Sequence, residues 1–387
     1  MIFLDAAATT PVRREAIEAM FPYLTNQFGN PSSHHELGEL AATALERARE
    51  QCAEVLGCHA EELTFTSGGT EADNLALKGI ALARRAADPS LNRVLISAIE
   101  HPAIVESADY LRRVHGFTVE TVPVDSTGLV DPAVFAGMLA DSAPGGVAVA
   151  SIMYANNEVG TVQDIPALAA AAADAGVPLH SDAVQAAGWL SLDVGSLRVT
   201  AMSISGHKVG APKGVGLLFL KSGTLCEPLV HGGGQERGTR SGTENVAFAV
   251  ALATALRLAE AGRDDAVERV TALREAYIGQ VLTGVPSSRL TGHGTRRLPN
   301  VASFVFPGTS GESVLLELER RGIVCSSGSA CAAGSDEPSA VLSAMGVERT
   351  VAQTALRFSF GAGVTAAELD TAAAELAAAV ARMQRLG

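Results

Sequence analysis

Apolar and polar positions follow two alternating patterns over the first two thirds of the chain. Short apolar runs, rich in Val, Ile and Leu, are separated by longer segments with the apolar spacing of amphipathic helices. The strand-like runs are 63–66, 94–97, 117–122, 147–153, 177–181, 201–205 and 214–220. The helix-like segments between them are 70–85, 102–115, 132–139 and 165–175. This alternation predicts an α/β fold with a largely parallel sheet and helices on both faces.

The remaining segments predict more than one domain, as a length of 387 residues also indicates. An arm and a short amphipathic helix, with Pro11 in its first turn, precede a helix over 36–56. From Asn245 a helix-like segment runs to Leu282 and leads to strands at 300–306, 323–325 and 356–360 and helices at 311–321 and 366–385. We therefore expect an arm over 1–15 that contributes to the small domain, a large domain over 16–255 and a small α+β domain over 256–387.

Five polar residues come just after predicted strands. They are Thr70, His101, Asn156, Asp182 and Lys208. Ligand sites of parallel sheets lie beyond the carboxyl ends of the strands, so these side chains are expected to meet in one pocket.

Two Gly-containing turns have the donors for an anion. The Ser-Gly-Gly-Thr turn at 67–70 opens a helix, where backbone N–H groups and the Thr70 hydroxyl can bind a phosphate; a simple turn capped by Thr70 is the alternative. In the Ser-Gly-His-Lys turn at 205–208, Ser205 and His207 can add donors. Lys208 can form a Schiff base with an aldehyde cofactor, or it is a surface lysine beside a turn.

Four other residues near these turns have a chemical and a structural interpretation. Asp182 ends an apolar strand, and a carboxylate there needs a cation such as a protonated pyridine nitrogen. The alternative is that Asp182 caps the next helix. His101 can stack on a planar ring and move protons, or it is a capping or core histidine. Asn156 and Gln185 can hydrogen-bond a phenolic oxygen, although such amides more often satisfy backbone groups.

The last third of the chain supplies a cation and a thiol. Arg357 lies in an apolar strand, and its guanidinium suits either a substrate α-carboxylate or an internal acid. Cys331 lies in a Ser-, Gly- and Ala-rich stretch, which predicts a mobile loop over about 324–339 and an accessible thiol. The Gly-rich loops at 232–236 and 240–243 have no obvious role within one protomer.

Composition narrows the function classes. A formal net charge of -13 disfavours direct nucleic-acid and anionic-membrane binding. No apolar run is long enough to span a membrane and the start does not resemble a secretory signal, so a cytoplasmic protein is expected. The five cysteines form no C-x-x-C pair and the histidines show no ligand spacing, so no intrinsic metal site is expected.

Taken together, the motifs resemble those of the NifS/IscS-type cysteine desulfurases, in the class V aminotransferase family of fold-type I pyridoxal-phosphate enzymes. Single motifs are weak, but the ordered set is specific and spans nearly the whole chain. It comprises LD at 4–5, AATTP at 7–11, TSGGTEADN at 66–74, ANNEVGT at 155–161, SDAVQ at 181–185, SGHK at 205–208, GGGQE at 232–236, RSGT at 240–243, SSGSAC at 326–331 and RFSFG at 357–361.

The resemblance implies roles for these residues. Lys208 would hold pyridoxal 5′-phosphate covalently, Asp182 would pair with the pyridinium nitrogen, and His101 would stack on the ring and assist proton transfer. Asn156 and Gln185 would contact the ring oxygen. The phosphate would be held by Gly69, Thr70, Ser205 and His207. Thr243 would reach the phosphate from the partner subunit of a homodimer. Arg357, helped by Asn156, would bind the carboxylate of L-cysteine, and the Cys331 thiolate would attack its sulfur and carry a persulfide.

Several alternatives stay open beside this interpretation. Another fold-type I enzyme, such as an aminotransferase or a selenocysteine lyase, would keep Lys208 and Asp182 without needing Cys331, and a non-catalytic sulfur-transfer partner would need none of them. The sulfur acceptor is open between an iron–sulfur scaffold and a tRNA-thiolation protein, as is transient ligation of a cluster by Cys331. Ala211, Ala332 and Ala340 depart from the family pattern, and the last two bear on loop contacts and partner choice.

Overall fold

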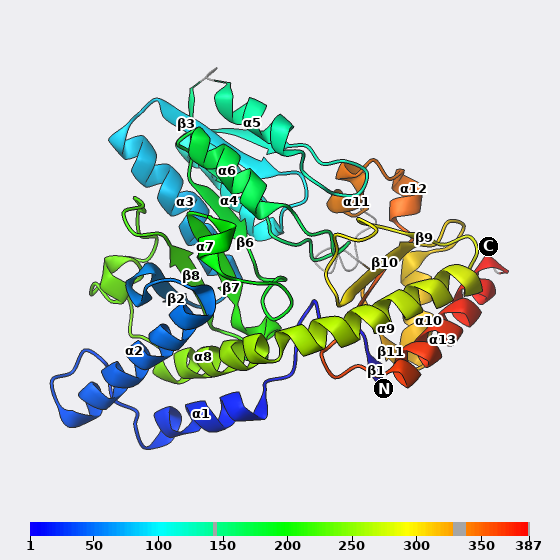
Figure 1. Cartoon of the computed structure of the whole chain (residues 1–387), viewed down its shortest axis with the longest axis horizontal. Coiled ribbons are helices and arrows are strands. Elements are labelled where there is room, and N and C mark those ends of the chain that lie inside the picture. The colour runs from blue at the N-terminus through cyan, green and yellow to red at the C-terminus, as the bar shows by residue number, and fades with distance from the viewer. Residues whose placement is uncertain (142–144, 328–337, 386–387) are drawn as a thin grey trace.

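The computed structural model describes residues 1–141, 145–327 and 338–385, and shows a larger α/β lobe beside a smaller lobe (Figure 1). The larger lobe is built on a seven-stranded sheet in the order β2-β8-β7-β6-β5-β3-β4. Its strands are β2 (Leu63–Thr66), β3 (Leu91–Ser97), β4 (Thr118–Val122), β5 (Gly146–Ser151), β6 (Leu179–Asp182), β7 (Ala201–Ser205) and β8 (Gly216–Leu220). Only β8 runs against its neighbours in this sheet, so the carboxyl ends of the other strands meet at one edge.

Helices cover both faces of this sheet. The helices of the lobe are α1 (Arg14–Thr25), α2 (Glu36–Leu56), α3 (Gly69–Ala87), α4 (Pro102–His115), α5 (Pro132–Ala140), α6 (Ile165–Asp174), α7 (Val194–Leu197) and α8 (Val246–Ala261). Short 3-10 turns lie at Ala60–Glu62, Gly206–Lys208 and Glu236–Gly238. Apolar side chains of α3 and α4 form one buried cluster with the sheet, and those of α2, α6 and α8 form another, which explains the apolar stripe of each helix.

The smaller lobe has its own core. Its sheet has the order β12-β10-β9, with antiparallel pairs between β9 (Arg289–Leu290), β10 (Val301–Val305) and β12 (Ala355–Ser359). Around it lie α9 (Arg263–Gly284), α10 (Gly311–Arg320), α11 (Ala340–Ala344), α12 (Arg349–Ala352) and α13 (Ala366–Gln384). Tyr277 of α9 packs edge-on against Phe304, Phe358 and Phe360, which fixes the helix to the sheet. The N-terminal β1 (Ile2–Phe3) pairs in parallel with β11 (Ile323–Val324) in this lobe.

The predicted fold class is confirmed, since the sheet is mostly parallel and lies between helices. The helix expected over 245–282 is instead two helices, because Gly262 leaves the helical conformation with φ -101° and ψ 8° between α8 and α9. Pro11 lies ahead of α1, which begins at Arg14. The expected 323–325 strand pairs with the arm and not with the three-stranded sheet. The domain boundaries stay a prediction.

Candidate active site

The carboxyl edge of the large sheet gathers residues that are far apart in the chain. Asp182 is the last residue of β6 and Ser205 the last of β7. His207 and Lys208 lie in the 3-10 turn that follows β7. His101 precedes α4, and its Nδ1 accepts a hydrogen bond from the Ala103 N–H at 3.1 Å.

The start of α3 packs closely against this edge. A Cβ atom on Gly69 would lie 2.8 Å from Val184 Cγ2 and 3.2 Å from Ser205 Cβ, so only glycine allows the helix to approach the end of β7. The Thr70 side chain is exposed in the first turn. The positive end of the α3 dipole and the Ser205 hydroxyl therefore face the same region, which suits a phosphate.

Asp182 is a buried carboxylate with cations nearby. It is 4% exposed, and its Oδ1 accepts from the Val184 N–H at 2.8 Å. Burial raises the pKa of Asp182, while the charges of His101 and Lys208 lower it. Burial also lowers the pKa of His101. The site thus combines an acid, an imidazole and an amine that act on one another electrostatically.

Two other buried acids surround Asp182. Asp73 Oδ1 and Glu100 Oε2 are buried without a hydrogen-bond partner among the described residues. Burial raises the pKa of Asp73 well above its usual range and that of Glu100 to about 8. Burial raises the pKa of all three acids, but only for Asp182 do His101 and Lys208 act to lower it.

His180 lies under the same region as a neutral group. Its ring nitrogens are 2.9 Å from the hydroxyls of Ser151 and Ser203, and Nε2 is 3.7 Å from Asp73 Oδ1. Burial lowers the pKa of His180 to about 3. A row of polar side chains on three adjacent strands therefore supports the end of β6.

The N-terminal arm lies across Lys208. The Lys208 Nζ donates to the carbonyl oxygen of Ala7 and, at 2.8 Å, to that of Ala8. Gln185 Nε2 also donates to Ala7 O, at 3.0 Å. The arm then passes His207, the residue before Lys208 in the turn. The Thr10 N–H and hydroxyl both donate to His207 O. Two backbone carbonyls of the arm thus bind the Lys208 amine.

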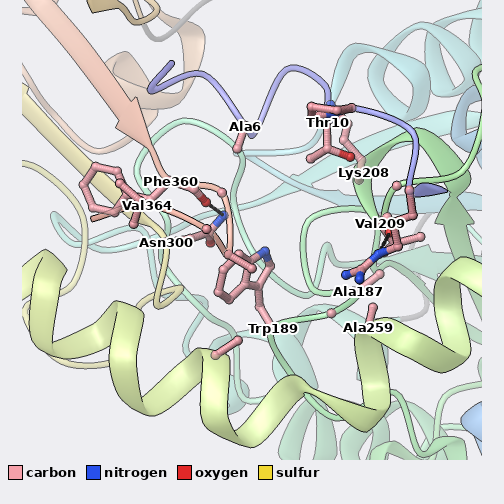
Figure 2. A pocket seen from close by; sticks show the side chains of 18 of the residues that line it. Ala6, Thr10, Ala187, Trp189, Lys208, Val209, Ala259, Asn300, Phe360 and Val364 are labelled. Carbon is pink, nitrogen blue, oxygen red and sulfur yellow. Dashed lines mark hydrogen bonds between the residues drawn. The ribbon is translucent and has the colours of Figure 1, made fainter. Parts of the chain in front are cut away.

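A cavity of about 580 Å³ opens beside Lys208, between the arm, the junction of α8 and α9, and the end of β12. Figure 2 shows Lys208 and Thr10 on one side of it and Asn300, Phe360 and Trp189 on the other. Gln185 is also part of its wall, whereas Asp182 and His101 are not. The cavity therefore reaches Lys208 but not Asp182 or His101 at the sheet edge.

Arg357 of β12 is held from two sides. It is 2% exposed; its Nη2 lies 2.6 Å from Asp5 Oδ1 and its Nη1 donates to Asn157 O at 2.8 Å. The internal acid that the sequence left open as a partner is thus present. Arg357 Nε is buried and has no partner among the described residues. Within the part of the chain that the structure describes, one donor of the guanidinium is therefore unused.

Three predicted site residues need a separate description. Asn156 is fully buried; its Nδ2 donates to Ile99 O at 3.0 Å and its Oδ1 accepts from the N–H groups of Glu158 and Val159, so it satisfies backbone groups. Thr243 is exposed in the loop before α8. Cys331 lies outside the described residues.

Sequence reasoning missed Asp5, Asp73 and Glu100. Asp73 could have been noticed, because it lies on the apolar stripe of α3 between Ala72 and Ala76. Glu100 precedes His101 after an apolar strand and gave a similar signal. Asp5 gave none beyond its motif, since its partner is 352 positions away.

Comparison with known proteins assigns the family. Residues 2–371 match the family model described as aminotransferase class-V. The chain belongs to the class-V aminotransferase family. Within it, the chain is 44% identical over 386 residues to an IscS-like cysteine desulfurase of Mycobacterium tuberculosis, covering 100% of this chain and 98% of that protein. It is 42% identical over 386 residues to the cysteine desulfurase NifS of Azotobacter vinelandii, covering 100% and 94%.

Solved structures of the family agree. A NifS-like protein superposes with a TM-score of 0.89 at 33% identity, covering 98% of this chain and 99% of that one. A structure described as SspA in complex with cysteine superposes with a TM-score of 0.80 at 31% identity, covering 93% and 99%. This class-V aminotransferase is therefore a member of the NifS/IscS-type cysteine desulfurases, as the motifs indicated.

Class-V aminotransferases of this type use pyridoxal 5′-phosphate, and the residues present fit it. The start of α3 and Ser205 suit its phosphate, and the Lys208 amine suits its aldehyde. The carboxylate of buried Asp182 accepts one backbone hydrogen bond, from Val184 to Oδ1, and suits a protonated ring nitrogen. Among the described residues no group of three His, Cys, Asp or Glu is arranged to hold a metal ion. No helix within residues 1–141, 145–327 and 338–385 is long and apolar enough to cross a membrane.

Proposed function

We propose that this chain is a cysteine desulfurase, which converts L-cysteine to L-alanine and transfers the sulfur to Cys331 as a persulfide and then to an acceptor protein. The observation that carries the proposal is the meeting of Lys208, His101 and buried Asp182 at one sheet edge, each within electrostatic reach of the others. The 44% identity to an IscS-like cysteine desulfurase over the whole chain supports the choice of substrate.

The residues that would hold the cofactor divide by chemistry. Lys208 would hold the aldehyde through Nζ, Asp182 would pair with the ring nitrogen, and His101 would stack on the ring. The phosphate contacts are Gly69, Thr70, Ser205 and His207. Asn156 and Gln185 are proposed for the ring oxygen, and Gln185 Nε2 would have to leave Ala7 O to serve it. When bound, pyridoxal 5′-phosphate supplies an electron sink for charge that develops at the substrate α-carbon.

The protein's own groups handle protons and sulfur. Lys208 Nζ removes the proton from the α-carbon of the substrate, whose carboxylate Arg357 binds with help from Asn156. His101 assists the proton transfer, because burial lowers its pKa and favours the neutral imidazole. The Cys331 thiolate attacks the substrate sulfur; an S–S bond forms and the C–S bond breaks with its electron pair left on carbon. Protonation of that carbon, and return of a proton from Lys208 Nζ to the α-carbon, yields L-alanine.

We further infer a homodimer in which Thr243 of one copy reaches the phosphate site of the other. Its exposed position before α8 supports this. Large apolar side chains exposed on and after α1 offer a surface that a second copy would cover: Ile17 (44%), Phe21 (60%), Leu24 (53%) and Phe28 (67%).

The acceptor is proposed to be an iron–sulfur scaffold protein, which fits the IscS and NifS names of the relatives. A tRNA-thiolation protein is the second candidate, because the upstream chemistry is the same. We expect the enzyme to work in the cytoplasm, where thiols such as Cys331 stay reduced.

Turnover of L-cysteine tests the proposal. The purified holoenzyme with a thiol reductant should form L-alanine and sulfide in equal amounts, and Cys331→Ser should abolish both while the cofactor stays bound. Cys58→Ser is the matched control, because Cys58 lies at the end of α2 and burial raises its pKa to about 12. Undiminished sulfide release by Cys331→Ser would favour a selenocysteine lyase or another fold-type I enzyme.

A further inference from the structure

The N-terminal arm is fixed between two strands of the smaller lobe. The Leu4 N–H donates to Val324 O at 2.7 Å, and Leu4 O accepts from the Ser359 N–H at 2.8 Å. Ala6 N–H donates to Ser359 O at 3.0 Å and Ala7 N–H to Ser359 Oγ at 2.9 Å. These bonds on both sides of Asp5 determine the position of its side chain, which is 19% exposed and lies against Arg357.

Arg357 has donors to spare beyond those that Asp5 occupies. A guanidinium carries five N–H donors. Asp5 Oδ1 takes one on Nη2, Asn157 O takes one on Nη1, and the buried Nε is without a partner among the described residues. The edge formed by Nε and Nη2 suits a planar carboxylate. Asp5 and a ligand carboxylate can therefore bind the same guanidinium together.

The other titratable groups near Arg357, Glu158 and Cys325, carry less negative charge than Asp5. Burial raises the pKa of Glu158 to about 7, and its carboxyl accepts from Ser339 Oγ at 2.5 Å. Burial raises the pKa of the Cys325 thiol to about 12, so that thiol is neutral. Asp5 is thus the acid in direct contact with Arg357, and it offsets part of the positive charge that attracts a ligand carboxylate.

We propose that Asp5 sets the affinity of the α-carboxylate site by sharing Arg357 with the bound amino acid. Two carboxylates on one guanidinium repel each other, so Asp5 weakens the hold on substrate and product and lets L-alanine leave. This role rests on the proposed function for the identity of the amino acid and for Arg357 as the ligand of its carboxylate. The affinity of the site for a carboxylate is a separate property of the chain.

The test compares L-alanine binding to wild-type holoenzyme and to Asp5→Asn, followed by the absorbance of the bound cofactor. Asparagine keeps an oxygen for Arg357 Nη2 but removes the charge. We expect the dissociation constant of L-alanine to fall about tenfold, the size of one charge interaction across a guanidinium. An unchanged or higher dissociation constant would overturn the proposal, because Asp5 would then only position Arg357.

Two comparisons make the result specific. L-Alaninamide, which lacks the carboxylate, should bind wild type and Asp5→Asn alike; an equal gain for both ligands would contradict charge sharing. Asp174→Asn, at the exposed end of α6, removes the same net charge and should leave the L-alanine affinity unchanged. If wild type binds L-alanine but does not turn over L-cysteine, the proposed function fails while this test still gives its answer.

Discussion

The cofactor edge and the carboxylate site neutralise buried charge in different ways. At the edge, Asp182 is buried with His101 and Lys208 acting on it from a distance, and its direct donor is a backbone N–H. At the carboxylate site, Arg357 already has a carboxylate at 2.6 Å. In our proposal the edge is short of a cation, which the protonated ring nitrogen of the cofactor would supply, whereas the carboxylate site is already balanced and would bind its ligand by sharing.

Replacing Asp182, the acid at the edge, should have the largest effect. Asp182→Asn keeps the Val184 hydrogen bond but removes the charge that pairs with the ring nitrogen. We expect kcat/KM for L-cysteine to fall by roughly 10² to 10³, as when one preorganised electrostatic group is removed. Steady-state kinetics with saturating cofactor measure the loss, with Asp174→Asn as the control. A loss below threefold would show that Asp182 has a structural role.

Removing the cation of the other site should have a smaller and different effect. Arg357→Gln loses a charged hydrogen bond to the substrate carboxylate, and we expect KM for L-cysteine to rise about 10- to 100-fold with a smaller change in kcat. The same kinetics separate the two constants. A fall in kcat with KM unchanged would contradict the assignment of Arg357 as the carboxylate ligand.

Glu100, one of the two buried acids near Asp182, should make the free energy of unfolding depend on pH. The pKa of Glu100 is about 8, raised by burial, while an unfolded glutamate titrates near 4.3, so between these values the folded state holds the extra proton. The free energy of unfolding should therefore fall as pH rises from about 5 to 8, by up to about 1.4 kcal/mol per pH unit from this group.

Glu100→Gln, which mimics the protonated acid, should remove that slope. Denaturant unfolding of both proteins at pH 5, 6.5 and 8 measures it. Parallel stability profiles of the two proteins would mean that Glu100 is ionised in the folded state.

The two regions also differ in how far the sequence predicted them. Asp182 and Ser205 end two parallel strands and Lys208 follows one of them, so the strand pattern located all three. Strand β2 matched its predicted bounds because its flanking turns are strong signals. The Asp5–Arg357 contact has no local signal, because tertiary packing alone joins residues 352 positions apart. The sequence alone did not decide whether Asn156 hydrogen-bonds backbone groups, since a motif does not show which groups an amide satisfies.

The most direct measurement concerns the amine at position 208. Borohydride reduction of the native holoenzyme, followed by peptide mass spectrometry, should add the mass of the reduced cofactor to the peptide that contains Lys208. The corresponding peptide of Lys208→Ala should be unmodified. Modification of another lysine, such as exposed Lys221, with the Lys208 peptide unchanged would contradict this prediction.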